Sequence, residues 1–322
     1  MFSSNEDVLK KIKSQDWVER FIAAKTIGEK KLKDAIEDVI ELLDDDNVQV
    51  RIAAVVALKS FNSKKILEHL IRTLADSSEW VRVHAVEAIG QYNESKHIEL
   101  LSQFLENEES DKVRATLIKV LGELGGAKVL PIITLYLKDS NARVRANSVE
   151  AIERISGSFN VDMREHIIPL LDDENNRVKA NSVKALFKMG ESKAIEVLKN
   201  MITSKDDWMR ASAAYVFGVI DYDDGIQFLV DSLKDECWFV IKNVIKSLVK
   251  KGIKILPALE NLLKKPRINI NVKINAISVL GELGSVDGLK LLIPMLNDEN
   301  GDVRQLAEST VDKLHEITGK KH

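Results

Sequence analysis

Cysteine is nearly absent from this sequence, and long apolar runs are missing altogether. Among the 322 residues, Cys237 is the one cysteine, so the chain has no intramolecular disulfide and no thiolate cluster for a metal. No apolar run reaches membrane-spanning length, and the N-terminus lacks the cationic and apolar segments of a signal peptide. These absences predict a cytoplasmic protein.

A charge excess of either sign is also missing. Lys and Arg (47) nearly balance Asp and Glu (50), giving a net charge of −3, so any ligand preference must come from a local surface. Phosphate-binding motifs of the GxxxxGK[ST] and GxGxxG types do not occur in a suitable context. The six histidines share no common position in the pattern described below, which makes a metal site improbable. We therefore assign no catalytic residue, no metal and no cofactor, and an enzyme is not the leading interpretation.

One short phrase recurs ten times along the chain. It consists of a Val in most cases, then a basic residue that we call the anchor, then a small residue three positions later and an aliphatic residue seven positions later. The ten anchor positions are Arg20, Arg51, Arg82, Arg114, Arg145, Lys179, Arg210, Ile241, Lys273 and Arg304, at spacings of 31 to 34 residues. A fixed period of this length is typical of stacked repeats, and we predict one repeat domain over residues 1–322.

Each repeat is predicted to be a helical hairpin. Positions −1, +3 and +7 from the anchor lie on one side of a 3.6-residue helix, which predicts an amphipathic second helix. An apolar, helix-spaced segment upstream, such as Ile66 to Leu74, predicts a first helix. Asp occurs six positions before the anchor in six repeats, in a turn where a short acceptor can cap the next helix. The predicted fold is all-α, a right-handed α-solenoid (α-α superhelix) of about ten hairpins.

The ends and interruptions of the pattern carry further expectations. Positions +1, +4 and +8 form a second stripe, mostly small or apolar, that should face the following repeat. In the tenth repeat they are Gln305, Glu308 and Asp312, as expected of a last repeat with water beyond it, so we expect a complete array. Pro169 and Pro294 fall inside first helices and should bend them. In the ninth repeat a basic turn, residues 264–269, replaces the acidic one; it is either a partner-binding loop or, as we favour, a tolerated change.

The acidic turn, the Val-Arg pair, the small residue and the aliphatic-Gly ending resemble the HEAT-like repeats of the phycobilisome-lyase type, over essentially the whole chain. The resemblance implies that the turn Asp and the anchor Arg link successive repeats, so the anchors are expected to be structural. It also suggests three enzyme classes. Deoxyhypusine hydroxylase carries paired His-Glu dipeptides for two irons, whereas this sequence has only His315-Glu316. A bilin lyase or chaperone subunit and a HEAT-like alkylpurine DNA glycosylase stay open as alternatives.

In HEAT arrays the exposed side of the second helices lines a concave groove. Positions −2, +2, +5 and +9 form that side here, and from the fourth to the eighth repeat they include nine basic residues and two acidic ones, Glu123 and Glu150, a local excess of +7. Asn147, Asn181 and Asn243 at position +2 could hold an extended backbone. The predicted groove residues are Trp80, His84, Lys112, Lys119, Arg143, Asn147, Arg154, Arg177, Asn181, Lys184, Lys188, Trp208, Tyr215, Phe239, Asn243, Lys246 and Lys250.

A plainer interpretation of these cations is that Lys and Arg solubilise exposed helices. Against it, the acidic residues lie mostly on turns and first helices, and aromatic residues border the groove. We predict a non-catalytic protein-binding scaffold or adaptor that holds an acidic partner segment, with nucleic acid as the less favoured ligand.

Overall fold

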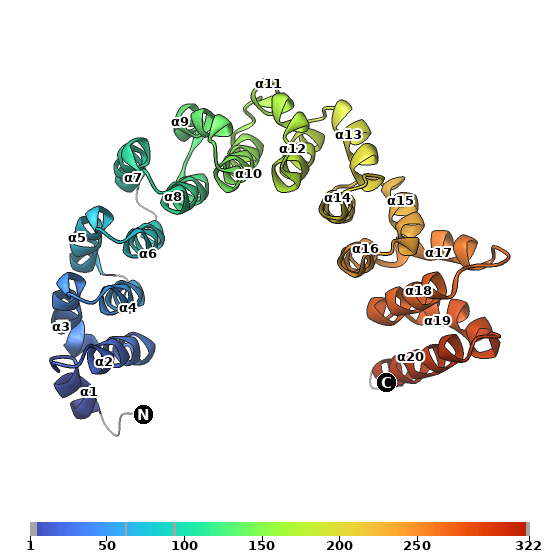
Figure 1. The fold of residues 1–322 in the computed structure, drawn as a ribbon, viewed down its shortest axis with the longest axis horizontal. Coiled ribbons are helices and arrows are strands. Elements are labelled where there is room, and N and C mark those ends of the chain that lie inside the picture. Colours follow the sequence, from blue (N-terminus) through green and yellow to red (C-terminus); the bar gives the residue numbers. More distant parts are fainter. Residues whose placement is uncertain (1–4, 62, 93–94, 320–322) are drawn as a thin grey trace. The chain divides into compact units, whose positions relative to one another are not determined.

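The computed structural model describes residues 5–61, 63–92 and 95–319. These residues form helices and turns without a β-strand, and the contacts divide the chain into two compact units, Met1–His166 (unit 1) and Ile167–His322 (unit 2). Helical hairpins follow one another through each unit, as Figure 1 shows. The prediction of an all-α solenoid is confirmed.

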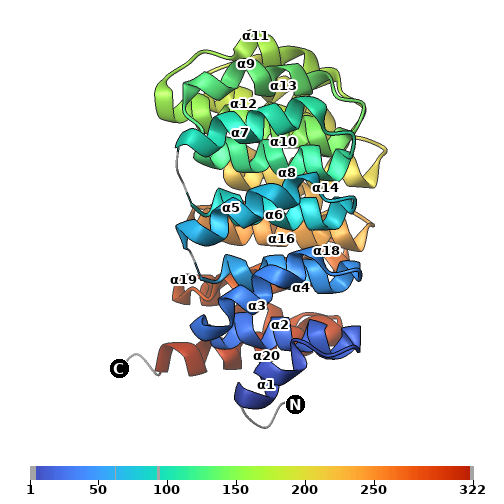
Figure 2. The ribbon, with the colours of Figure 1, turned by 90° about the vertical axis from the view of Figure 1, so that its left-hand side faces the viewer.

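Unit 1 contains five hairpins, stacked in chain order (Figure 2). The odd-numbered helices are first helices and the even-numbered ones are second helices, which pack against one another in sequence. The helices are α1 (Asn5–Lys11), α2 (Trp17–Lys30), α3 (Ile36–Glu41), α4 (Val48–Lys59), α5 (Lys64–Arg72), α6 (Glu79–Gly90), α7 (Ser95–Asn107), α8 (Asp111–Leu124), α9 (Leu130–Leu135) and α10 (Ala142–Phe159).

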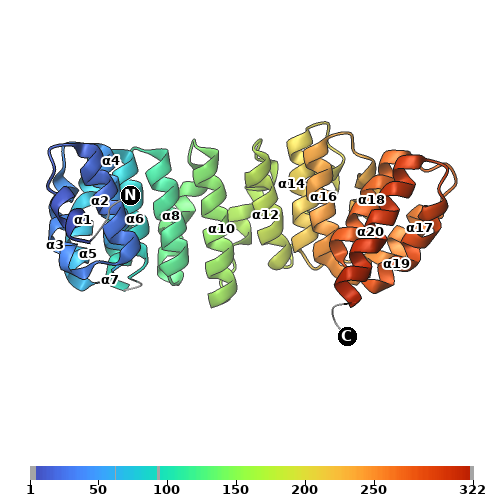
Figure 3. The same cartoon turned by 90° about the horizontal axis from the view of Figure 1, so that it is seen from below.

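Unit 2 repeats this arrangement, beginning within α11 (Arg164–Ile167), which contains the boundary. Figure 3 shows its second helices α14 and α16 side by side. The remaining helices are α12 (Asn176–Lys188), α13 (Lys193–Ile202), α14 (Asp207–Val219), α15 (Gly225–Asp231), α16 (Trp238–Lys251), α17 (Leu256–Leu263), α18 (Ile270–Leu283), α19 (Val286–Leu292) and α20 (Gly301–Gly319).

The predicted stripe at positions −1, +3 and +7 forms the core. In α4 it consists of Val50, Ala54 and Leu58, all fully buried. Where the small residue is a serine, as at Ser148 in α10, the buried hydroxyl donates to the carbonyl oxygen four residues earlier, so its burial leaves no unsatisfied donor. Burial of these side chains between helices is the main driving force of the fold.

First helices end in a 3₁₀ turn in most repeats, whether or not proline is present. The turn is three residues long in segments such as Leu42–Asp44 and Ser232–Lys234. At Pro169 and Pro294 it lengthens to five residues, because a proline cannot donate the α-helical hydrogen bond. Where the sequence predicted a bend, the structure has a longer 3₁₀ segment.

Glycines at position +8 let consecutive second helices approach closely. A Cβ atom added at Gly122 of α8 would lie 2.5 Å from the Cβ of Ala151 in α10, and one at Gly28 would lie 2.7 Å from the Cα of Ala57. Gly218 meets Ser247 in the same way. The predicted second stripe does face the following repeat, and its glycines set the interhelical distance.

At several junctions an ion pair joins one repeat to the next, and we call each such pair a rung. The anchor of one repeat bonds the acidic residue six positions before the next anchor. The rungs are Arg20–Asp45, Arg51–Asp76, Arg82–Glu108, Arg114–Asp139, Arg210–Asp235 and Lys273–Asp298, with nitrogen–oxygen distances of 2.5 to 2.9 Å. These six anchors are therefore structural, as the family resemblance implied.

The rung acid is not the helix cap that the sequence suggested. One of its carboxylate oxygens accepts the N–H two residues later, as Oδ1 of Asp45 does from Asn47 at 2.9 Å. Asn47 is the N-cap, and its side chain accepts from the N–H of Gln49. Because a capping residue immediately precedes the helix, Asp45 is two residues too early for this role and serves the rung instead.

Candidate partner-binding surface

The exposed side of the second helices, which we call the second-helix face, is the candidate surface in each unit. Positions −2, +5 and +9 are mostly exposed or half-buried, as predicted. On unit 1 these positions contribute Trp80, Lys112, Lys119, Arg143 and Arg154, and on unit 2 they contribute Arg177, Lys184, Lys188, Trp208, Tyr215, Phe239, Lys246 and Lys250.

Position +2 differs from the prediction because it lies between neighbouring second helices. Asn147 is buried, and its Nδ2 donates to the carbonyl oxygen of Ala115 in the preceding second helix at 2.8 Å. Asn181 is buried too, whereas half-buried Asn243 donates to the carbonyl oxygen of Phe239 in its own helix. The expectation of an exposed amide column for an extended backbone is therefore wrong for Asn147 and Asn181, which serve packing.

On unit 1, carboxylates neutralise part of the expected positive charge. The Nζ of Lys112 lies 2.5 Å from a carboxylate oxygen of Glu79 and 4.6 Å from the centre of the Trp80 ring. Arg154 pairs with Glu123 at 3.8 Å. Glu79 is the first residue of a second helix, so the acidic residues are less strictly segregated than the sequence suggested. The excess of +7 did not include Glu79 and therefore overstates the positive charge of the predicted groove residues.

Unit 2 presents an aromatic cluster made by Trp208, Trp238 and Phe239 on its second-helix face. The rings of Trp208 and Phe239 stack with centroids 4.4 Å apart, and Trp238 meets Phe239 edge-on at 5.9 Å. Trp208 and Trp238 nevertheless remain 64% and 73% exposed. The aromatic cluster therefore offers a large apolar area to solvent, which is unusual for tryptophan in the absence of a partner.

Cations lie along the same helix as the aromatic cluster. Lys242 is 6.0 Å from the Trp238 ring, and Lys246 and Lys250 follow on exposed positions of α16. Within the described residues, Lys246 and Lys250 form no ion pair with a carboxylate. Their charges are therefore available to an acidic ligand, in contrast to Lys112 and Arg154.

The sequence prediction missed Trp238, Lys242 and an apolar patch on unit 1. Trp238 lies one position before Phe239, the first predicted groove residue of its repeat, and the consecutive pair Trp238-Phe239 was a usable signal. The apolar patch, formed by Phe21, Ile22 and Val56, occupies the second-helix face of the first two repeats; Phe21 and Val56 line a cavity of about 420 Å³ there.

These hairpins, with first helices in one layer and second helices in another, define an all-α solenoid. A family model described as HEAT repeats matches residues 5–90, 67–153, 130–218 and 226–311. The chain therefore belongs to the HEAT-repeat family. A search of the curated proteins finds no match.

Two solved structures share the fold. Kap95p, in a structure concerned with its binding to RanGDP, is 13% identical with a TM-score of 0.61, and the alignment covers 97% of this chain and 50% of that one. Importin beta is 12% identical with a TM-score of 0.58, over 96% of this chain and 50% of that one. This chain thus spans half the length of each, and identities this low show a common fold alone. In the described part of the chain, no helix has the length and apolar character needed to span a membrane.

Proposed function

We propose that the protein is a non-catalytic scaffold or adaptor that holds an acidic segment of a protein partner on the second-helix face of unit 2. The observation that carries this proposal is the aromatic cluster beside the unpaired cations Lys246 and Lys250. Exposed tryptophans are frequent anchors of protein interfaces, and neighbouring cations favour an acidic partner and speed its association.

The solenoid architecture supports this assignment. Stacked repeats create extended surfaces that suit peptides and domains, and Kap95p, which shares this fold, is described in a structure that concerns its binding to RanGDP. Two finer points belong to the same proposal: that the repeats are of the phycobilisome-lyase type, and that the protein works in the cytoplasm.

The test compares two double variants that alter the same number of exposed side chains. Trp238→Ala/Lys246→Glu changes the proposed surface, whereas Ile253→Ala/Lys193→Glu changes exposed positions outside the second helices. A fluorescent peptide of alternating glutamate and leucine, followed by fluorescence anisotropy, is the probe. We expect the first variant to bind about tenfold or more weakly, since it loses an anchor and reverses a charge, and the second to bind like the unmodified protein.

Equal affinities of the two variants would overturn the proposal, provided that both melt like the unmodified chain. Single-stranded DNA is titrated in parallel over a salt series. If it binds more tightly than the peptide, with a steep linear loss of log affinity against log salt, the ligand is a nucleic-acid backbone and the protein-scaffold assignment is wrong.

A further inference from the structure

The junction between the eighth and ninth repeats lacks a rung, and both of its positions are changed. The anchor position holds Ile241, which has no charge, and the acid position holds Arg267. If only the anchor or only the acid had been replaced, the junction would hold one unpaired charge of a standard rung. Here the acid has been replaced by a cation, so the junction has an excess of positive charge.

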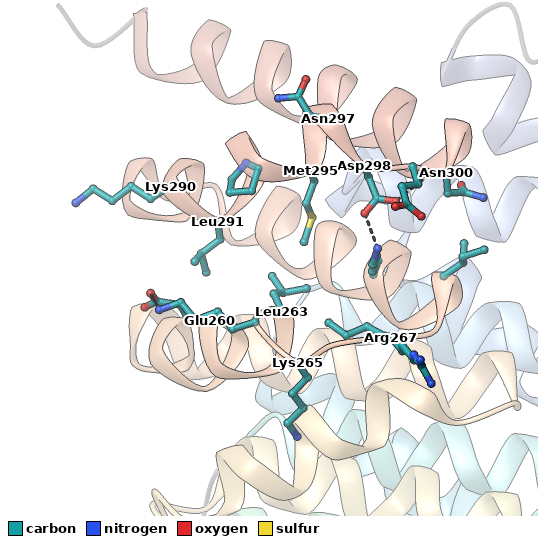
Figure 4. A pocket seen from close by; sticks show the side chains of 16 residues that line it. Glu260, Leu263, Lys265, Arg267, Lys290, Leu291, Met295, Asn297, Asp298 and Asn300 are labelled. Carbon is teal, nitrogen blue, oxygen red and sulfur yellow. Dashed lines mark hydrogen bonds and ion pairs between the residues drawn. The ribbon is translucent and has the colours of Figure 1, made fainter.

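The backbone at Arg267 also differs from that of the rung acids. Arg267 has φ of 60°, whereas Asp235 and Asp298, at the same position in neighbouring repeats, have φ of −60° and −62°. A left-handed conformation is uncommon for a non-glycine residue. Figure 4 shows the cavity between the ninth and tenth repeats, which Lys265 and Arg267 help to line; within this view both side chains extend from the loop away from the Lys273–Asp298 rung.

Cavities occur at three successive junctions of unit 2, and they differ in charge. The cavity between the seventh and eighth repeats, about 570 Å³, contains the rung Arg210–Asp235, and the one between the ninth and tenth, about 950 Å³, contains Lys273–Asp298. The cavity between the eighth and ninth repeats, about 300 Å³, contains no rung. The middle cavity is therefore the exception.

Three cations and one carboxylate line this middle cavity. The cations are Lys234, Lys265 and Arg267, and the carboxylate is Asp231, which accepts a hydrogen bond from Gln227 at 2.9 Å. Among the described residues, no ion pair involves any of the three cations. The other lining side chains are mainly aliphatic, including Val230, Leu262, Ile268 and Val272.

We propose that this junction is a second binding site, which takes a glutamate or aspartate side chain, next to an aliphatic residue, from a protein partner. The carboxylate pairs with Arg267 and Lys265, while the aliphatic neighbour covers Leu262 and Ile268. A cavity of about 300 Å³ has room for one or two side chains and is at the lower limit for a small organic ligand. Arginine binds a carboxylate through two parallel hydrogen bonds, which favours this chemistry.

The experiment observes Arg267 directly, because an acidic peptide can also bind the second-helix face. The Nε–Hε signal of Arg267 in the full-length protein is assigned by its disappearance in Arg267→Lys, and the glutamate-leucine peptide is then titrated. We expect this signal to shift, and to shift equally in Lys246→Glu/Lys250→Glu, which reverses the two cations of the second-helix face. This outcome separates the two proposals.

Arg267→Asp supplies the affinity test. Aspartate tolerates the left-handed conformation better than most residues. Its carboxylate is expected to pair with Lys234 and Lys265, so that they are no longer available to the peptide. We expect peptide affinity at this site, measured in the Lys246→Glu/Lys250→Glu background, to fall about tenfold or more. Lys290→Ala, in the neighbouring cavity, should leave it unchanged. Any of three results would overturn the proposal. The Arg267 signal does not shift on titration, a folded Arg267→Asp variant binds the peptide with unaltered affinity, or inorganic phosphate displaces the peptide at a concentration lower than that of the peptide.

Discussion

The anchor arginine joins two turns because its guanidinium donates in two directions. The Nε and Nη2 of Arg51 donate to the carboxylate of Asp76 in the next repeat at 2.8 and 3.0 Å, and Nη1 donates to the carbonyl oxygen of Asp45 in its own turn at 2.8 Å. Lysine, with a single ammonium, cannot match this fork. The preference for arginine at most anchors follows from this geometry.

We predict that Arg51→Met lowers the free energy of unfolding by about 2–3 kcal/mol, because the mostly buried carboxylate of Asp76 loses its partner. Lys65→Met is the matched control: the Lys65–Glu37 pair also joins neighbouring repeats, at 2.6 Å, but both side chains are about two-thirds exposed. Its loss should cost about 0.5 kcal/mol or less. Denaturant unfolding followed by circular dichroism measures both, and equal costs would show that the rung is not a stabilising contact.

At the scale of helices, packing distance outweighs helix propensity. Gly122 in α8 and Gly157 in α10 both lie within helices, where alanine normally adds about 1 kcal/mol of stability. A Cβ at Gly122 would collide with Ala151, whereas one at Gly157 has no atom within 4 Å. The effect of alanine on stability at these two positions therefore separates helix propensity from helix packing.

We predict opposite signs for the same substitution at these glycines. Gly122→Ala should destabilise the protein by about 1–3 kcal/mol, since α10 must move away, and Gly157→Ala should stabilise it by about 0.5–1 kcal/mol. Thermal melts of the two variants beside the unmodified chain provide the measurement. A stabilised Gly122→Ala would mean that the helices separate at no cost and that the close approach is incidental.

The same close approach explains what the sequence could and could not predict. The period alone placed Val50, Ala54 and Leu58 in the core, since one helix face must be buried whatever its neighbours do. The burial of Asn147 depends instead on how near α8 lies, which Gly122 and Ala151 determine across the junction. The pairing of Lys112 with Glu79 likewise joins residues 33 positions apart in neighbouring repeats. Such contacts follow from interhelical geometry, which a single-helix pattern does not contain.

Across the whole molecule, the rungs couple stability to pH. Burial alone would raise the pKa of Asp45, but hydrogen bonds from Arg20 and from the backbone N–H of Asn47 outweigh it, and the pKa lies below the ordinary value of 3.8. The same balance lowers the pKa values of Glu108, Asp235 and Asp298. A carboxylate with a depressed folded-state pKa stabilises the fold above its unfolded pKa, and this stabilisation is lost as the pH falls through the folded value.

We therefore predict that the melting temperature falls as the pH is lowered through about 4 and below, where the carboxyl groups of the unfolded chain begin to bind protons. Arg20→Met isolates one contribution: at neutral pH the variant should melt below the unmodified protein, because Asp45 is left ionised and mostly buried without its partner. As the pH falls, Asp45 becomes protonated in both proteins, and the difference between their melting temperatures should shrink. Circular dichroism melts at constant ionic strength from neutral pH to about pH 3 measure this difference. If the difference in melting temperature stays constant or widens as the pH falls, the arginine acts through its hydrogen bonds to the carbonyl oxygens of Ser14 and Gln15 rather than through the charge on Asp45.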